Sequence, residues 1–152
     1  YQDLQCYINI PDTSGRDSLF QAEARRCKDI LDNNKNINER RFCIFDELFS
    51  GTNPYEAIGA ATGFLKYLNN HKNITFVITT HFLDLCKKLE EDDSIVNLNM
   101  EINNDADDNF NYTYKVIPGI SNVKGGIKVL KDLEFPQEII NTAVSVIDKL
   151  NI

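Results

Sequence analysis

Several features that define whole classes of protein are missing from this sequence. No apolar run is long enough to span a membrane, and no basic segment followed by an apolar block resembles a secretory signal. The chain opens on Tyr1 instead of Met, within a predicted strand, so we expect it to be a fragment of a longer protein. Its 152 residues and hydrophobic fraction of 42% suffice for one compact soluble domain.

Basic residues are scarce relative to acidic ones. The chain has 16 Lys and Arg against 23 Asp and Glu, which gives a net charge of −7. Proteins neutralise nucleic-acid phosphates with Lys and Arg, so this segment is not expected to grip DNA or RNA. If the parent protein binds DNA, we expect other parts of it to do so.

Closely spaced cysteine pairs are also absent. The four cysteines, Cys6, Cys27, Cys43 and Cys86, are scattered and form no Cys-x-x-Cys pair. Zinc sites need close ligand pairs, and disulfide scaffolds need denser cysteine in shorter chains. We therefore expect reduced thiols in a hydrophobic core, and a reducing compartment, the cytoplasm or the nucleus.

The apolar pattern predicts an α/β fold. Apolar runs at residues 7–10, 42–45 and 74–78 are typical of strands, and the last two are continuous, as in strands buried on both faces. Helical spacing follows each run, at residues 18–31, around 58–68 and up to about residue 89. Period-two alternation at 96–102 and 110–116 predicts an antiparallel edge hairpin on a mainly parallel sheet. Helices at 122–133 and 136–150 close the chain.

Candidate chemistry follows two of the predicted strands. Asp46 and Glu47 come directly after the run 42–45, at the end of the strand where α/β folds place ligands. Successive strand residues point to opposite sides, so the two carboxylates can take different roles. The next strand ends at His81, and adjacent parallel strands bring their carboxyl ends together, so His81 is expected near the acids. Solvated acids and a structural histidine remain the alternative.

Two polar loops add candidate residues. Residues 12–23 run from a small polar loop into a helix, whose free N–H groups and dipole favour an anion. Ser18 can add a hydroxyl donor there. The alternative is a plain helix cap supplied by Ser18 or Asp17. The second loop, residues 50–54, lies between the two strands that carry the acids and the histidine.

Taken together, these segments resemble the MutS family of DNA mismatch-repair ATPases. Residues 46–56 look like the family's Walker B and D-loop segment, Asp-Glu-x-Gly-Arg-Gly-Thr-Ser-Thr-x-Asp. Residues 18–23 resemble its signature Ser-Thr-Phe-Met-x-Glu, residues 80–82 its Thr-His-Tyr/Phe, and residues 126–140 its closing Gly-Ile-x-Val and Pro-x-x-Ile/Val motifs. Order and spacing agree from about residue 12 to residue 150. The departures, which indicate a divergent branch, are Arg16, Phe49, Ser50, Asn53, Pro54 and Glu134.

The resemblance implies a three-layer P-loop NTPase fold of the ABC class, in which two subunits sandwich two nucleotides. Residues 1–121 would carry the signature helix, Walker B, D-loop, histidine and edge hairpin, and residues 122–152 the C-terminal helices. The implied cofactors are ATP and Mg²⁺, and the implied partner is a second MutS-like subunit. The implied roles are Mg²⁺ binding by Asp46, base catalysis by Glu47, γ-phosphate sensing by His81, contact with the partner's ATP by Ser18, and an interface lined by Ser50, Gly51, Thr52 and Asn53.

The sequence contains no Gly-x-x-x-x-Gly-Lys-Ser/Thr motif, the loop that seats nucleotide phosphates. In the family this loop lies upstream, so we expect that the 152-residue chain alone neither binds ATP tightly nor hydrolyses it. One alternative is another ABC-class ATPase, in transport, recombination or chromosome maintenance. These usually carry a Leu-Ser-Gly-Gly-type signature, which this sequence lacks. The other is a non-catalytic dimerisation module, against which the intact Asp46, Glu47 and His81 count.

Overall fold

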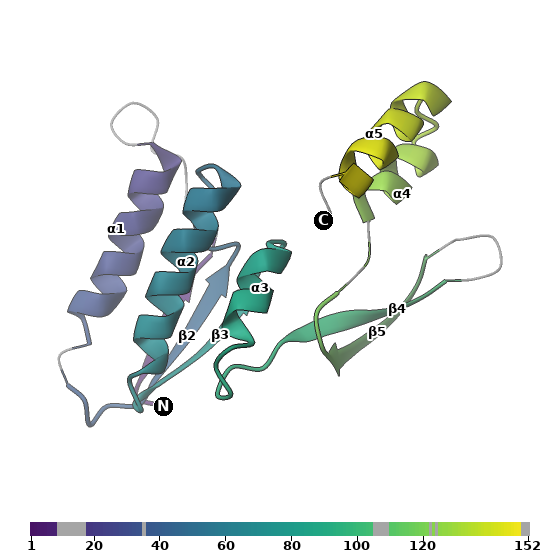
Figure 1. Cartoon of the computed structure of the whole chain (residues 1–152). Helices are drawn as coiled ribbons and strands as arrows, with labels where there is room; N and C mark the ends of the chain where they lie inside the picture. Colours follow the sequence, from purple (N-terminus) through teal and green to yellow (C-terminus); the bar gives the residue numbers. More distant parts are fainter. Residues whose placement is uncertain (9–17, 35, 105–109, 122, 124, 150–152) are drawn as a thin grey trace. The chain divides into compact units, whose positions relative to one another are not determined.

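The computed structural model describes residues 1–8, 18–34, 36–104, 110–121, 123 and 125–149. The chain forms two compact units, Tyr1–Leu98 with Pro118–Ile120, and Asn99–Ile117 with Ser121–Ile152. Figure 1 traces both units, with the first in purple to teal. Every residue that the sequence singled out for chemistry belongs to the first unit, which is therefore described in more detail.

A three-stranded parallel sheet forms the centre of the first unit. Its order is β1 (Asp3–Tyr7), β2 (Arg41–Asp46) and β3 (Ile74–Thr79). The predicted parallel arrangement of strands separated by helices is confirmed. The first strand ends at Tyr7, earlier than predicted, and residues 9–17 lie outside the described part of the chain.

Three helices follow the strands, α1 (Leu19–Asp32), α2 (Pro54–Asn69) and α3 (Leu83–Leu89). They lie over one face of the sheet (Figure 1), as their apolar stripes require. Together with the inward side chains of the strands they enclose one core. Its buried residues are Tyr7, Cys27, Ile30, Cys43, Phe45, Leu48, Phe49, Ala57, Ala61, Leu65, Leu68, Leu85 and Leu89.

The opposite face of the sheet also carries apolar side chains, and the described elements of the first unit leave it open. Leu4 is 61% exposed and Val77 is 52% exposed. Phe42 and Ile44, which share this face by register, are half-buried. The prediction that the runs 42–45 and 74–78 are buried on both faces is therefore wrong for this chain. The sheet has the two apolar faces of a buried parallel sheet, but α1, α2 and α3 of the first unit cover only one.

The second unit contains a hairpin and two helices. β4 (Leu98–Asn104) pairs with β5 (Phe110–Pro118), and α4 (Gly125–Asp132) is followed by α5 (Gln137–Lys149). Both the hairpin and the closing helices were predicted. Among the described residues the hairpin forms a separate two-stranded sheet, whereas we expected it at the edge of the main sheet. Apolar alternation defines two strands and their mutual pairing, but it carries no information about a third partner.

The end of α4 explains one departure from the family pattern. Glu134, which stands where the family has glycine, has a φ of 55°. Its N–H donates to the Lys131 carbonyl and the N–H of Phe135 donates to the Leu130 carbonyl, each at 3.0 Å. This pair of bonds is a Schellman motif, in which the residue that leaves the helix adopts a left-handed conformation. The family's glycine at this position thus reflects the left-handed backbone conformation, which glutamate adopts at a cost in free energy.

The four cysteines are free thiols; Cys27 and Cys43 lie in the core as predicted, whereas Cys6 and Cys86 are half-buried. Burial raises the pKa of Cys27 to about 12 and that of Cys43 to about 11, so both stay protonated at neutral pH. Within the described residues, no helix has the length and apolar character that crossing a bilayer would need.

Candidate functional site

The carboxyl edge of the parallel sheet brings the predicted acids beside the end of β3. The register puts Asp46 directly opposite Thr79, and Thr79 Oγ1 donates to Asp46 Oδ1 at 2.5 Å. The N–H of Glu47 donates to the Thr79 carbonyl at 3.1 Å, which holds the chain to β3 for one residue beyond β2. The expected adjacency of the acidic pair and the following strand end is confirmed.

Glu47 and His81 form a close pair just beyond the strand ends. Nδ1 of His81 lies 2.5 Å from Oε2 of Glu47, while the two side chains remain 64% and 41% exposed, respectively. The imidazole also packs against Phe82, with ring centroids 4.3 Å apart. Because Nδ1 faces the carboxylate, Nε2 is the ring nitrogen available to a ligand. The structure thus brings together the two residues for which the resemblance implies catalytic roles.

The backbone at Glu47 is strained. Its φ of 51° lies in the left-handed region, which costs a non-glycine residue about 1–3 kcal/mol. Strain of this kind persists where surrounding contacts over-determine the conformation, and it concentrates at functional sites. Here the hydrogen bond to Thr79 and the contact with His81 supply those contacts.

Segment 50–53, which the resemblance places at a subunit interface, is held by hydrogen bonds within the unit. Ser50 Oγ donates to Glu23 Oε1 at 3.1 Å, and Thr52 Oγ1 donates to Glu56 Oε2 at 2.7 Å. The Asn53 side chain accepts the N–H of Glu56 at 3.1 Å and caps α2. Asparagine at the cap and proline directly after it are both preferred at a helix start, which accounts locally for this departure from the family pattern. An interface role for the segment stays a prediction.

Ser18 caps α1. Its Oγ accepts the N–H of Gln21 at 3.3 Å, and Gln21 Oε1 accepts the N–H of Ser18 at 2.9 Å, a reciprocal capping box. Capping, one of the two interpretations of this serine, is therefore confirmed. The other candidate cap, Asp17, lies outside the described residues. Contact between Ser18 and a partner's nucleotide remains a prediction.

Glu23 is a member of the site region that sequence reasoning did not single out. It lies on α1 and is only 2% exposed. Its Oε2 accepts the N–H of Gly51 at 3.0 Å, in addition to the bond from Ser50. Burial, and then the charge of Glu23, raise the pKa of the neighbouring Tyr7 phenol well above its usual value. The available signal was the final Glu of the signature pattern, but acids on helices usually face water.

Gly51 lies too close to α1 for a larger residue. A methyl group there would come within 2.7 Å of Leu19 Cγ and of the Phe20 backbone nitrogen. We expect Gly51→Ala to destabilise the first unit by about 1–3 kcal/mol through overpacking. The matched change Gly63→Ala, on α2 with nothing within 4 Å, should stabilise by about 0.5–1 kcal/mol. Thermal unfolding of both variants measures this, and shifts of equal sign and size would contradict it.

The carboxylate of Asp46 suits a magnesium ion that is bound mainly by water and phosphate. It is exposed, and the Thr79 hydroxyl contacts one of its oxygens. Mg²⁺ is commonly held by one or two carboxylates, several waters and the substrate's phosphates. The described residues contain no group of three or more His, Cys, Asp or Glu that could hold a metal without such help. The donor set therefore fits Mg²⁺ together with a nucleotide better than a metal site built by the protein alone.

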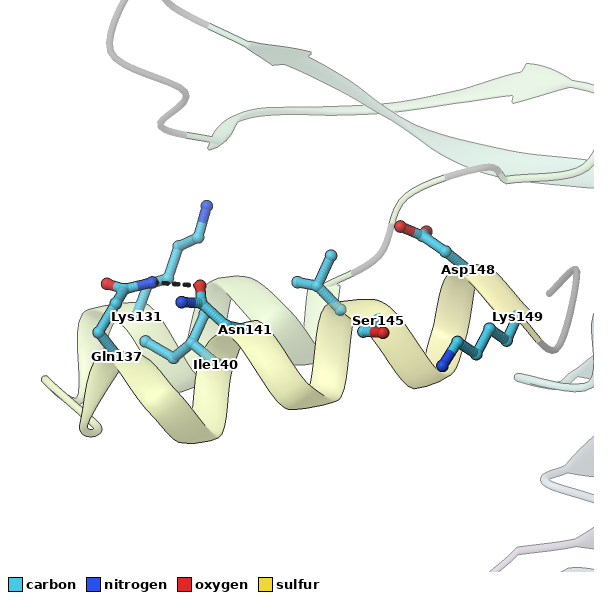
Figure 2. A pocket seen from close by; sticks show the side chains of 8 residues that line it. Lys131, Gln137, Ile140, Asn141, Ser145, Asp148 and Lys149 are labelled. Atoms are coloured by element: carbon cyan, nitrogen blue, oxygen red, sulfur yellow. Dashed lines mark hydrogen bonds between the residues drawn. The ribbon is translucent and has the colours of Figure 1, made fainter.

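A hollow in the second unit lies along α5 and is separate from this chemistry. Figure 2 shows its lining side chains, which include Gln137, Asn141 and Lys149. Gln137 Nε2 donates to Asn141 Oδ1 at 2.8 Å across one turn of the helix. None of the candidate residues lines this hollow.

The fold and the site define a class: an α/β domain with its candidate ligand site at the carboxyl edge of a parallel sheet. The comparison with protein families is more specific. Residues 5–151 match MutS domain V, and the chain belongs to this family. MutS domain V is part of the ATPase of MutS-family mismatch repair proteins.

Individual relatives agree with the family match. The DNA mismatch repair protein MutS of Pelotomaculum thermopropionicum is 28% identical over 141 residues, covering 93% of this chain and 16% of the relative. Endonuclease MutS2 of Fusobacterium nucleatum is 29% identical over 134 residues, which cover 88% of this chain and 14% of the relative. DNA mismatch repair protein MSH2 of Saccharomyces cerevisiae is 28% identical over 134 residues, which cover 83% of this chain and 14% of the relative. The chain thus spans about a sixth or less of these relatives.

Proposed function

We propose that the protein containing this chain is a MutS-like ATPase that couples ATP-driven closure of a dimer to the binding of mismatched DNA. The observation that carries the proposal is the contact between Glu47 and His81, 2.5 Å apart beyond the ends of neighbouring parallel strands. An exposed carboxylate, Asp46, ends β2 directly before Glu47. Three groups with different chemistry therefore stand at one edge of the sheet.

In this proposal each residue has its own role. Asp46 would help to hold Mg²⁺, which would supply positive charge beside the nucleotide phosphates. Glu47 orients the attacking water and accepts its proton. His81 donates from Nδ1 to Glu47, and Nε2 donates to the γ-phosphate when the ring carries a proton on both nitrogens. Closure of the dimer brings Ser18 and the interface segment 50–53 to the partner's nucleotide.

The loop that binds the nucleotide phosphates would come from a segment upstream of the chain. The open face of the sheet supports this, since Leu4 and Val77 are half exposed or more, with Phe42 and Ile44 beside them. A helix that follows an upstream phosphate loop would cover this face and complete the three layers of a P-loop NTPase. The net charge of −7 leaves DNA binding to other parts of the protein. Free thiols fit a cytoplasmic or nuclear location.

A recombination or chromosome-maintenance ATPase is the second candidate. It is kept because one relative, at 29% identity, is named Endonuclease MutS2 and not a mismatch repair protein. The site would perform the same hydrolysis in either case, so the two candidates differ in the DNA structure that the parent protein binds. Comparing the stimulation of ATPase activity by mismatched, homoduplex and branched DNA separates them.

The proposed activity is tested by comparing the full-length protein with the 152-residue chain. We expect the full-length protein to release phosphate from ATP in a Mg²⁺-dependent reaction, whereas the 152-residue chain should release none above background. The reason is that the chain supplies the acids and the histidine but not the phosphate loop. Absence of hydrolysis by the full-length protein, with or without DNA, would refute the proposal. Hydrolysis by the short chain, lost in Glu47→Gln, would refute the need for the upstream loop.

A further inference from the structure

Glu23 is buried and accepts hydrogen bonds from the uncharged donors of Ser50 and Gly51, and the proposed catalytic roles do not use it. Only 2% of the residue is exposed, in the interior between α1 and the turn that follows β2. A carboxylate in such a place is costly unless hydrogen bonds satisfy its oxygens. Both oxygens are satisfied by the turn: Oε1 by the Ser50 hydroxyl and Oε2 by the Gly51 N–H.

The partners of Glu23 belong to the turn between β2 and α2, and other contacts tie that turn to α1 and to the end of β1. Phe49 is buried and packs against Phe20 of α1, with ring centroids 5.6 Å apart. The Phe49 N–H points to the Tyr7 hydroxyl at 3.5 Å, and Tyr7 is fully buried at the end of β1. Gly51 approaches the first turn of α1 so closely that a methyl group would clash. Residues 49–51 are therefore fixed to the start of α1 from several sides.

We propose that Glu23 is a positioning residue: it clamps the turn 49–51 to the first turn of α1, so that Ser18 and the interface segment 50–53 move as one body. This inference rests on the proposed function, in which both elements must reach the partner's nucleotide together. Misplacement by about 1 Å can cost two orders of magnitude in rate, so a clamp that fixes the relative position of two contact elements affects the rate of the reaction. Glu23 itself is buried and touches no substrate.

The test compares Glu23→Met with Glu23→Gln in the full-length protein. Methionine fills a similar volume but accepts no strong hydrogen bond, so the Gly51 N–H is left buried and unsatisfied. Glutamine keeps an oxygen for Gly51, and its amide can donate to Ser50 Oγ. In Glu23→Met we expect hydrogen exchange of the amides in 49–53 to be about 5- to 150-fold faster than in the wild type, with exchange in β3 unchanged.

Kinetics supply the second readout. We expect kcat for ATP in Glu23→Met to fall about tenfold or more, with KM within about twofold, because the phosphate loop and Asp46 still bind the nucleotide. Glu23→Gln should keep both constants within about threefold of the wild type. If Glu23→Met fails to fold, Ser50→Ala, which removes one bond at an exposed residue, should show the same pattern to a smaller degree.

Several results would overturn the clamp. Unchanged exchange in 49–53, or an unchanged kcat, in Glu23→Met would do so, as would a loss in Glu23→Gln as large as that in Glu23→Met. A wild-type protein without ATPase activity would overturn the proposed function itself. A wild-type protein that hydrolyses ATP alongside a fully active Glu23→Met variant would overturn only this inference.

Discussion

Replacing Glu47 by Gln in the full-length protein is expected to lower kcat for ATP hydrolysis by about 10²–10⁴-fold, the usual contribution of a positioned general base. The amide has the shape of the carboxylate and can still contact Nδ1 of His81, 2.5 Å from the glutamate oxygen in the wild type. What it loses is the ability to accept a proton from water. ATP binding should persist, so a bound, unhydrolysed nucleotide is expected to accumulate. Phosphate release and nucleotide retention on a filter measure the two effects.

A matched control is Glu91→Gln. Glu91 is exposed and pairs with Lys66 at 3.1 Å, beyond the end of α3. Its loss should leave kcat unchanged, because an exposed ion pair contributes little to stability and the residue belongs to no proposed role. A Glu47→Gln variant that hydrolyses ATP within about threefold of the wild-type rate would show that Glu47 is not the base.

The second large effect is on stability, and it concerns two residues whose backbone has a left-handed conformation and that stand where the family has glycine. Phe49 has a φ of 59° and Glu134 has a φ of 55°. Glycine at either position removes a backbone cost of about 1–2 kcal/mol. Glu134 is exposed, so Glu134→Gly should stabilise the second unit by about 1 kcal/mol. Phe49 is 5% exposed and packs between Phe20 and Phe64, so Phe49→Gly should destabilise the first unit by about 2–4 kcal/mol, the lost packing exceeding the relieved strain.

Local stability is measured by urea-dependent hydrogen exchange, read separately in β2 and in α4, since two units need not unfold together. The opposite signs are the informative result. Stabilisation by Phe49→Gly would mean that the buried ring contributes less than its strain costs. Destabilisation by Glu134→Gly would mean that contacts of the glutamate side chain matter more than the helix end.

Much of the fold could be predicted from the sequence because local patterns determined it. The apolar runs marked the strands, the helical spacing marked the core faces, and the order of the elements required parallel pairing. The neighbourhood of Glu47 and His81 followed from that topology, since parallel strands share a carboxyl edge. Ser18 could likewise be placed at a helix start from residue preference.

The rest depended on contacts that no local pattern encodes. Whether an apolar face is covered depends on other segments, which is why β2 and β3 turned out open on one side. The separate pairing of the hairpin has the same origin. The position of Glu23 is a long-range fact as well: its bond to Gly51 spans 28 residues, and nothing near it in the sequence marks it as buried.

The most direct test of the central claim is a structure of the full-length protein with Mg²⁺ and a non-hydrolysable ATP analogue. The account predicts the γ-phosphate within hydrogen-bonding distance of His81 Nε2, the carboxylate of Asp46 on the Mg²⁺ side, and Glu47 facing the water in line with the γ-phosphate. A nucleotide bound away from the carboxyl ends of β2 and β3, or His81 turned away from the γ-phosphate with Glu47 buried against another group, would contradict it.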